Sequence, residues 1–260
     1  MDLINCNRRP CRQAIVGGRV KIGGDAPVAV QSMTSTTTTD IEASVAQIRR
    51  IADAGADLVR LTAQGVREAE AIGQMEPQVN VPLVADIHFN PRAALAAARV
   101  VDKVRINPGN FCRPGADIAE SLEPLLEICR QRGVALRIGV NHGSLSPSIM
   151  ERFGDTPEGM VESAMEFIRV CAARNFHNLV VSIKASNTVV MVHTVRLLVE
   201  TMSREGLEYP LHLGVTEAGD GEDGRVKSAV GIGTLLRQGI GDTIRVSLSE
   251  DPERLSLIHI

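Results

Sequence analysis

Arginines at the ends of apolar runs are the residues of this chain best suited to bind a charged ligand. Three segments share the order small or apolar residue, Asp, two residues, Arg, aliphatic residue, polar residue: GADLVRLT at 55–62, VVDKVRINPGN at 100–110 and IGDTIRVSL at 240–248. The repeat places Arg60, Arg105 and Arg245 at equivalent positions. Guanidinium groups bind phosphate oxygens through paired hydrogen bonds. The repeat therefore predicts a site for an anion.

A carboxylate stands in a similar setting in the stretch LHLGVTEAGDGEDGRVKSAVGIG at 211–233. An apolar strand reaches Thr216 and Glu217, a Gly-rich loop follows, and a helix then begins with Arg225 and Lys227 near its start. The free N–H groups and dipole of a helix N-terminus favour a negatively charged, phosphorylated ligand. Strand–loop–helix passages with one glutamate are common, so this stretch alone does not indicate a binding site. The recurrence of the same layout along the chain favours one.

The elements that position these residues follow one rhythm from residue 28 onward. Asp40 and Asn187 are predicted N-caps, and Gly55, Gly133 and Gly239 follow predicted helix ends. The apolar strands lie at 28–33, 57–62, 82–87, 102–107, 134–140, 178–184, 210–216 and 243–248, and the helical patterns lie near 40–54, 65–76, 91–100, 116–131, 157–175, 187–205 and 225–238. Eight strands that alternate with helical patterns in 260 residues predict an α/β fold, a closed (β/α)8 TIM barrel, with an open doubly wound sheet as the alternative.

The ends of the chain are predicted to differ from the barrel. Residues 1–13 are polar and are expected to form a flexible N-terminus. The segment AIVGGRVKIGG at 14–24 reads as a β-hairpin that closes the bottom of the barrel. We therefore expect one substrate-binding domain over residues 14–250, followed by a truncated, non-native tail at 251–260.

The period of two in a β-strand predicts which side chains face the barrel interior. The aliphatic residues Val59, Ile106, Ile183 and Val246 are expected to face the helices. The inward pairs are Arg60 with Thr62, Asp86 with His88, Arg105 with Asn107, Arg137 with Asn141, Ser182 with Lys184, His212 with Thr216, and Arg245 with Ser247. Polar residues thus gather at the carboxyl ends of the strands, where barrel enzymes build their active sites.

Charge balance at that mouth predicts the ligand. One arginine at a strand end is more often a structural partner, but five cations converge here: Arg60, Arg105, Arg137, Lys184 and Arg245. The inward acids are chiefly Asp86 and Glu217, so an anion, and a diphosphate better than one carboxylate, must compensate the excess. Asp86 could be a structural acceptor or catalytic. His88 and His142 could donate hydrogen bonds or carry protons, and Asn141 is expected to bond ligand oxygens.

Composition excludes several classes of protein. The net charge is −3 and the chain has no Trp and one Tyr, which argues against a nucleic-acid surface. No apolar run reaches the roughly 20 residues that cross a membrane, and no secretory signal is present, so a cytoplasmic location is expected. Five scattered cysteines without a C-x-x-C pair indicate neither a disulfide framework nor a metal site in this chain.

Seven motifs in order carry a resemblance to a known family. They are IGGDAPVAVQSMT at 22–34, VPLVADIHF at 81–89, VRINPGN at 104–110, RIGVNHGSL at 137–145, VSIKAS at 181–186, LHLGVTEAG at 211–219 and GIGDTIRVSL at 239–248. Over about residues 13–250 the chain resembles the barrel domain of the 4-hydroxy-3-methylbut-2-enyl diphosphate synthase family, and it is closest to the long form of plants and some bacteria.

The resemblance implies a reductive ring opening of 2-C-methyl-D-erythritol 2,4-cyclodiphosphate in isoprenoid biosynthesis. Two electrons would come from ferredoxin or flavodoxin through a [4Fe–4S] cluster. By motif, the diphosphate would be held by Arg60, Arg105, Arg137, Asn141, Ser182, Lys184, Thr216 and Arg245, while Asp86, His88 and Glu217 would line the reacting end. Glu217 is the predicted acid/base group. The family works as a homodimer, in the bacterial cytosol or in a plastid.

The chain departs from the family after its eighth strand, where only SEDPERLSLIHI follows. The cluster ligands of the family have no counterpart among the five cysteines, so we expect this chain to bind substrate without turning it over. Two alternatives remain: a barrel enzyme like dihydropteroate synthase, and a non-catalytic anion-binding fragment.

Overall fold

Eight parallel strands form a barrel in the computed structural model, which describes residues 7–219 and 221–257. The strands are β3 (Ala29–Met33), β4 (Leu58–Ala63), β5 (Leu83–Ile87), β6 (Lys103–Ile106), β7 (Ala135–Asn141), β8 (Leu179–Lys184), β9 (His212–Leu213) and β10 (Thr243–Ile244). Their order is β8-β7-β6-β5-β4-β3-β10-β9, and a parallel bridge between Val181 and Leu211 closes the ring. The predicted TIM barrel is confirmed, and the open sheet is wrong.

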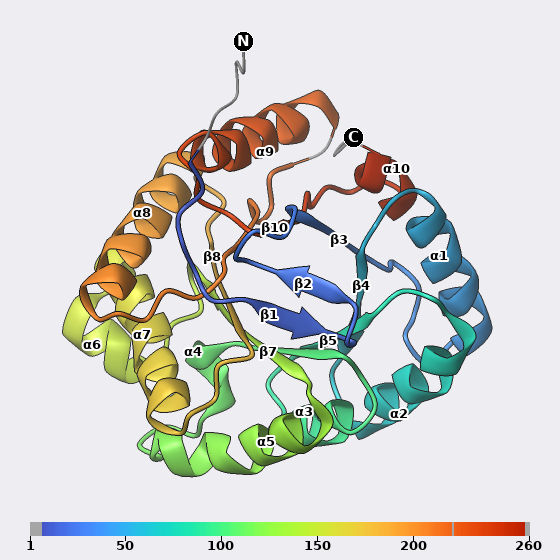
Figure 1. Cartoon of the computed structure of the whole chain (residues 1–260), viewed down its shortest axis with the longest axis horizontal. Helices are drawn as coiled ribbons and strands as arrows, with labels where there is room; N and C mark the ends of the chain where they lie inside the picture. Colours follow the sequence, from blue (N-terminus) through green and yellow to red (C-terminus); the bar gives the residue numbers. More distant parts are fainter. Residues whose placement is uncertain (1–6, 220, 258–260) are drawn as a thin grey trace.

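A ring of helices surrounds the strands (Figure 1). The helices are α1 (Ile41–Asp53), α2 (Val66–Met75), η1 (Glu76–Gln78), α3 (Pro91–Ala98), α4 (Pro108–Phe111), α5 (Ile118–Arg132), α6 (Pro147–Phe153), α7 (Pro157–Ala173), α8 (Thr188–Arg204), α9 (Gly221–Leu236) and α10 (Pro252–Leu257). Asp40 and Asn187 cap α1 and α8 as predicted, because their side chains accept from free N–H groups of the first turn. The outward residues Val59, Ile106, Ile183 and Val246 pack in the core between strands and helices.

The prediction from periodicity missed short elements and overestimated two strands. The helices α4 and α6 were not predicted, because each spans at most two turns and begins with a proline that reads as a loop signal. Of the strands predicted at 210–216 and 243–248, only two residues each pair as strand. The backbone nevertheless continues along its neighbours, since Arg245 N donates to Leu213 O at 3.0 Å and Thr216 N to Ala185 O at 3.2 Å.

The aspartates of the internal repeat fasten the amino ends of the strands. Each Asp accepts a hydrogen bond from a backbone N–H at the start of a neighbouring strand: Asp57 from Val30 at 2.7 Å, Asp102 from Leu83 at 2.9 Å, and Asp242 from Leu211 at 2.8 Å. The repeated unit therefore has two ends. Its Asp secures the bottom of the barrel, and its Arg projects at the top.

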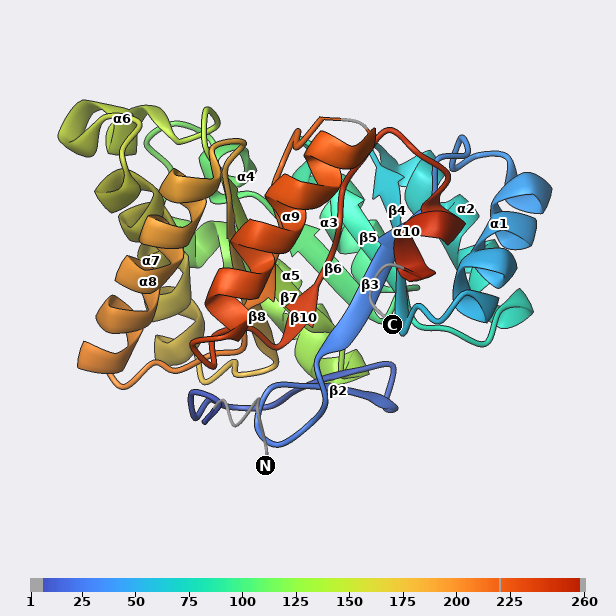
Figure 2. The ribbon, with the colours of Figure 1, turned by 90° about the horizontal axis from the view of Figure 1, so that it is seen from above.

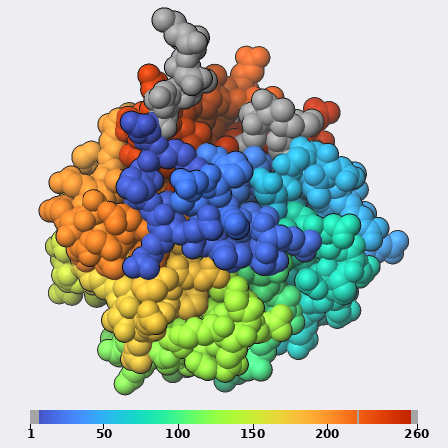
Figure 3. All heavy atoms as spheres, viewed as in Figure 1, coloured from blue at the N-terminus to red at the C-terminus, as the bar shows by residue number. Residues whose placement is uncertain are grey.

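The hairpin of β1 (Ala14–Val16) and β2 (Val20–Ile22) closes the bottom of the barrel, as predicted. Ala14, Val16 and Ile22 pack on inward residues of the strands, namely Ala29, Leu58, Val84, Ala135 and Val180. Atoms of the N-terminal region lie across the centre of this face in Figure 3. This apolar layer is called the floor below, and it leaves the opposite end of the barrel as the place for a site.

The chain before the hairpin contacts the bottom of the barrel. Arg8 pairs with Asp242 at 2.6 Å, Arg9 N donates to Gly239 O at 2.9 Å, and Arg12 N donates to Glu208 O at 2.9 Å. Arginines and N–H groups of residues 7–13 thus find acceptors at the bottom of the barrel, and the flexibility of the N-terminus stays a prediction. Residues 1–6 lie outside the described part of the chain.

The predicted tail contributes a helix to the ring. α10 extends past SEDPER to Leu257 and packs beside β3 and α1, with Leu255 buried and Glu253 paired to Arg50 at 2.9 Å. Ser32 of β3 donates to Pro252 O at 3.3 Å. Residues 258–260 lie outside the described part of the chain.

Candidate functional site

A pocket of about 550 Å³ opens at the carboxyl ends of the strands, the end of the barrel that faces away from the hairpin in Figure 2. Ten of the eleven predicted site residues line it: Arg60, Asp86, His88, Arg105, Arg137, Asn141, Lys184, Thr216, Glu217 and Arg245. The eleventh, Ser182, lies buried inside the barrel and does not reach the pocket surface. Ser182 lies inside the barrel, as strand periodicity predicted, but its short side chain ends below Lys184.

Asp86 is the buried acid of the pocket, and it is shared between two cations. Its Oδ2 lies 3.0 Å from Arg60 Nη1, and its Oδ1 lies 3.0 Å from Arg105 Nη1. His88 Nε2 lies 3.4 Å from Oδ2. Burial by itself would raise the pKa of Asp86, but Arg60, Arg105 and the His88 hydrogen bond outweigh it and hold that pKa well below its usual range. Asp86 is therefore an ionised structural acceptor for two arginines.

Three cations of the pocket have no carboxylate partner among the described residues. Arg137, Lys184 and Arg245 form no ion pair there, and Arg137 is 1% exposed with Nε and Nη1 unpartnered. Burial, followed by Arg60 and Arg105, lowers the pKa of Arg137 well below its ordinary value. Burial, followed by Arg245 and Arg137, does the same to the pKa of Lys184. Unpaired buried cations cost several kcal/mol, about what an anionic ligand would recover.

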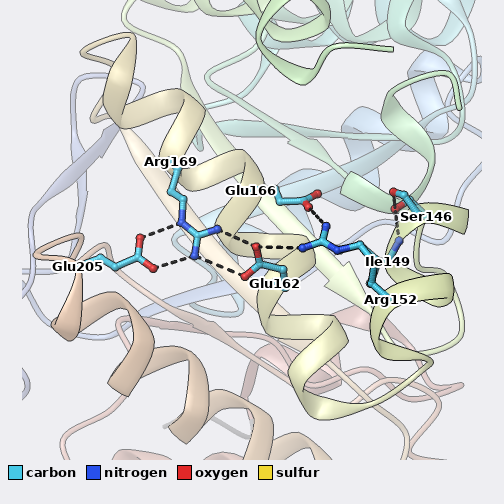
Figure 4. A network of polar contacts seen from close by, with 8 residues as sticks. Ser146, Ile149, Arg152, Glu162, Glu166, Arg169 and Glu205 are labelled. Atoms are coloured by element: carbon cyan, nitrogen blue, oxygen red, sulfur yellow. Dashed lines mark hydrogen bonds and ion pairs between the residues drawn. The ribbon is translucent and has the colours of Figure 1, made fainter. Parts of the chain in front are cut away.

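The exterior of the same barrel shows the opposite arrangement (Figure 4). Arg169 of α7 pairs with Glu162 at 2.8 Å and with Glu205 at 2.7 Å, and Arg152 of α6 pairs with Glu166 at 2.8 Å. Hydrogen bonding to Arg169 lowers the pKa of Glu205. These exterior cations have carboxylate partners, whereas three of the five pocket cations, Arg137, Lys184 and Arg245, have none among the described residues.

Neutral polar groups complete the wall beside the cations. With its amide oxygen toward Arg105 Nη2 at 3.2 Å, Asn141 also directs its nitrogen to Val140 O at 3.2 Å. Thr216 is half-buried at the edge of the pocket. Asn107, predicted to face inward with Arg105, instead accepts from Gly109 N at the start of α4. In this orientation the side-chain amide of Asn141 contacts Arg105, and the same side chain lines the pocket.

Glu217 lies at the rim, exposed to solvent, with a backbone φ of 52°. A left-handed conformation costs a residue other than glycine roughly 1–2 kcal/mol. Such strain recurs at functional sites, where the surrounding structure holds one side chain in a required position. Gly219 and the loop Ser247–Ser249 stand beside Glu217 in the lining of the pocket.

Two features of the site were missed by the sequence prediction. Met33 lines the pocket, and its sulfur lies 2.7 Å from Arg60 Nη2. Gly139 lies under Arg105, whose Nη2 donates to Gly139 O at 2.8 Å. Gly139 stands between Arg137 and Asn141 in the inward phase of β7, so strand periodicity could have identified it. Nothing in the local pattern distinguished Met33.

Replacing Gly139 with alanine is expected to weaken anion binding on the order of 10- to 100-fold, the value of one or two charge-assisted hydrogen bonds. A Cβ at this position would lie 2.5 Å from Arg105 Nε and 3.2 Å from Ser182 Oγ. Arg105 would have to leave Asp86 and Gly139 O. Calorimetric titration with an anionic ligand measures the effect, and Gly233→Ala is the matched control because nothing lies within 4 Å of its Cβ. Equal affinities for the two variants would contradict the role of Gly139.

The described cysteines do not assemble into a metal site. Cys11 is at the bottom of the barrel near Asp242, Cys112 follows α4, and Cys129 and Cys171 are buried in α5 and α7. Burial raises the pKa of Cys129 and of Cys171 to about 12 each, which disfavours the thiolate that binds metals. No group of three or more His, Cys, Asp or Glu suited to a metal ion occurs among the described residues. Cys6 lies outside them.

Fold and site together define a (β/α)8 barrel with a cation-lined pocket at the carboxyl ends of its strands. Solved structures confirm the fold: a dihydropteroate synthase from Stenotrophomonas maltophilia matches with a TM-score of 0.63 over 96% of each chain, at 15% identity. A truncated 3-deoxy-D-arabino-heptulosonate 7-phosphate synthase from Thermotoga maritima matches with a TM-score of 0.61 at 12% identity, over 96% of this chain and 90% of its own. The particular family is the GcpE TIM-barrel domain, to which this chain belongs and whose model matches residues 12–257.

Curated relatives support the same family. The chain is 58% identical to a 4-hydroxy-3-methylbut-2-en-1-yl diphosphate synthase (flavodoxin) of Parabacteroides distasonis, over 97% of this chain and 45% of the relative. It is 52% identical to the chloroplastic, ferredoxin-type synthase of Oryza sativa subsp. japonica, over 97% of this chain and 37% of the relative. The chain thus spans less than half the length of these relatives. No helix among the described residues is long and apolar enough to cross a membrane.

Proposed function

We propose that this barrel binds 2-C-methyl-D-erythritol 2,4-cyclodiphosphate and presents it for reductive ring opening to 4-hydroxy-3-methylbut-2-enyl diphosphate. The observation that carries the proposal is the trio Arg137, Lys184 and Arg245, which face one pocket without a carboxylate partner among the described residues. A cyclic diphosphate supplies two negative charges to such a trio. The names of the relatives agree with this substrate class.

The pocket assigns different tasks to its cations. Arg137, Lys184 and Arg245 bind the diphosphate directly, since their charges are not otherwise used. Arg60 and Arg105 are held by Asp86 and add hydrogen bonds from fixed positions. Asn141 and Thr216 add neutral polar groups to the ligand site, and Ser182 lies buried below Lys184 without reaching the pocket surface.

The reacting end of the substrate lies toward Glu217 and His88 at the open rim. Glu217 protonates the departing hydroxyl oxygen, which leaves as water. His88 is held against Asp86 at 3.4 Å and orients the substrate beside it. The carboxylate is open to solvent, and its strained backbone holds it at a fixed place beside the substrate.

Replacing Glu217 with glutamine is expected to lower kcat by about 100- to 10,000-fold and to leave substrate affinity equal or tighter, because proton transfer is lost while an anion is removed from the rim. Turnover is measured with the chain joined to the C-terminal part of the Parabacteroides distasonis relative. Glu222→Gln, an exposed acid in the first turn of α9, is the control. Comparable kcat values for the two variants would contradict the role of Glu217.

The reduction requires two electrons and a relay, and the described residues do not fit a cluster site. We therefore propose that a [4Fe–4S] cluster held outside them supplies the reducing equivalents, with flavodoxin or ferredoxin as donor, as in the names of the relatives. We further propose a homodimer of the whole protein, in a bacterial cytosol or a plastid.

Calorimetric titration of the 260-residue chain with the cyclodiphosphate tests the proposed function. Binding in the micromolar range is expected, and turnover with reduced ferredoxin or flavodoxin is expected only after the C-terminal part of a relative is joined to the chain. A pterin that displaced the cyclodiphosphate would instead support a dihydropteroate-synthase-like activity. Absence of cyclodiphosphate binding would refute the proposal.

A further inference from the structure

Beneath the pocket lies a second layer of inward polar side chains, here called the middle tier. Gln31 lies two positions from the floor residue Ala29 and from the pocket residue Met33, and Ser182 stands in the same way between Val180 and Lys184. Lys103 and Thr243 precede the pocket residues Arg105 and Arg245 by two positions. The middle tier consists of Gln31, Lys103, Arg137, Ser182, His212 and Thr243, each at most 2% exposed. Arg137 alone also lines the pocket, so it connects the two layers.

The middle tier has unsatisfied polar groups and contains no carboxylate. Unpartnered within the described residues are Gln31 Nε2, Arg137 Nε and Nη1, Ser182 Oγ, both ring nitrogens of His212, and Thr243 Oγ1. A buried polar atom without a partner costs about 1–3 kcal/mol. So many in one layer are unusual in a structure whose exterior pairs its charges closely. The two cationic side chains of the middle tier, Lys103 and Arg137, therefore have no carboxylate of their own layer to compensate them.

Lys103 is the titratable centre of this layer. It is fully buried, and its Nζ has one hydrogen bond, to Gln31 Oε1 at 3.0 Å. Burial first, then Arg137 and Arg60, lower the pKa of Lys103 well below its ordinary value. Burial first, then Arg137, Lys184, Lys103 and Arg60, lower the pKa of His212. The charged or titratable groups around the tier are Arg60 on β4, Asp86 on β5, Arg105 on β6, Arg137 on β7, Lys184 on β8, His212 on β9 and Arg245 beyond β10.

An anion in the pocket weakens the positive field that Lys103 experiences. Without a ligand, a proton on Lys103 is repelled by the neighbouring arginines, and Asp86 is already engaged by Arg60 and Arg105. Two negative charges held by Arg137 offset that repulsion, and in a low-dielectric interior they act with little screening. Gln31 Oε1 can accept from Lys103 whether the amine is neutral or protonated. The hydrogen bond is therefore compatible with both states.

We propose that Lys103 is a positioning residue of the anion site, acting through Arg137, and that it takes up a proton from solvent when the diphosphate binds. The neutral amine gains an N–H bond at its lone pair, and Arg137 stays charged and turns its free N–H groups to the phosphate oxygens. By reciprocity, a ligand that favours the protonated amine binds more weakly as pH rises. This inference rests on the proposed diphosphate-binding function.

The test is calorimetric titration of the 260-residue chain with 2-C-methyl-D-erythritol 2,4-cyclodiphosphate, in buffers of different ionisation enthalpy between pH 7 and 9. Each phosphorus of this probe carries one strongly acidic hydroxyl, so the probe does not titrate in that range. The wild-type chain is expected to take up about one proton more per bound ligand than Lys103→Met, and its Kd should rise more steeply with pH, by up to about tenfold per unit. Lys21→Met, on the exposed face of β2, is the matched control and should equal the wild type.

The proposed role of Lys103 and the proposed diphosphate-binding function can be refuted separately. Binding with equal proton uptake in wild type and Lys103→Met, or with none in the wild type, overturns the role of Lys103 and leaves the proposed function standing. No binding at all overturns both. Should Lys103→Met not fold, Gln31→Leu with Lys103→Met removes both hydrogen-bond partners at once, which is far less costly than removing one. The double variant must show the same loss of about one proton.

Discussion

Replacing Arg137 with methionine is expected to weaken diphosphate binding by about 100-fold or more and, at the same time, to raise the temperature at which the ligand-free chain unfolds. The two effects have one cause. Arg137 is 1% exposed, has no ion pair among the described residues, and leaves Nε and Nη1 without partners. An apolar residue of similar length removes the cost of this buried charge and, with it, the ligand's principal contact.

The size of the stability gain follows from measured replacements of buried charges. Substituting well-packed apolar residues for buried charged groups stabilises proteins by about 1–4 kcal/mol. In a domain of this length, 1 kcal/mol corresponds to roughly 2–4 °C in Tm. Thermal unfolding and calorimetric titration of the same samples measure both effects. Arg152→Met, which removes an exposed partner of Glu166, is the control and should change neither quantity appreciably. A less stable Arg137→Met variant that still binds would show that Arg137 serves the fold.

Replacing Asp86 with asparagine should have the converse effect on stability, a loss of about 3–5 kcal/mol, because two buried arginines lose their shared carboxylate. Diphosphate affinity should be retained or increased, since Arg60 and Arg105 become free to face the ligand. Urea unfolding measures the first effect and calorimetry the second. Asp251→Asn, at an exposed position, is the control. Loss of binding without loss of stability would assign Asp86 to the ligand and not to the arginines.

The pH dependence of stability provides a second readout for Asp86. Its pKa in the folded chain is held well below the usual value by Arg60 and Arg105. A carboxyl with a depressed folded pKa contributes stability above its unfolded pKa, about 4, and loses it as pH falls toward the folded value. Acid unfolding of the wild type should therefore steepen below about pH 4, and Asp86→Asn should lack this component. If stability fell equally with pH in the wild type and in Asp86→Asn, the ion pairs of Asp86 with Arg60 and Arg105 would be contradicted.

Together these two variants distinguish contributions to ligand binding from contributions to the stability of the fold. We expect Arg137 to reduce stability and to contribute to binding, and Asp86 to stabilise the two arginines that it pairs. The exterior network of Arg152, Arg169 and their glutamates shows how the same chain treats cations that have no ligand (Figure 4). Testing binding and stability on the same samples distinguishes the two kinds of cation directly.

The sequence by itself determined the architecture and the direction of the functional side chains. Periods of 2 and 3.6 are local properties, so they identified the strands, the main helices and the inward phase that brings Arg60, Arg105 and Arg137 to one mouth. The hairpin signal around Gly17 and Gly18 also identified the floor. The excess of cations over acids at the strand ends also followed from the sequence alone.

Only the tertiary structure decided how the inward side chains share the space. It assigned Asp86 to Arg60 and Arg105 together, placed Ser182 below the pocket, and put Gly139 under Arg105. It also showed the aspartates of the repeat accepting from the neighbouring strands, and it revealed the middle tier around Lys103. The reason is that a strand pattern fixes which way a side chain points, while its partners come from other strands, and the stagger between strands is set only when the barrel closes.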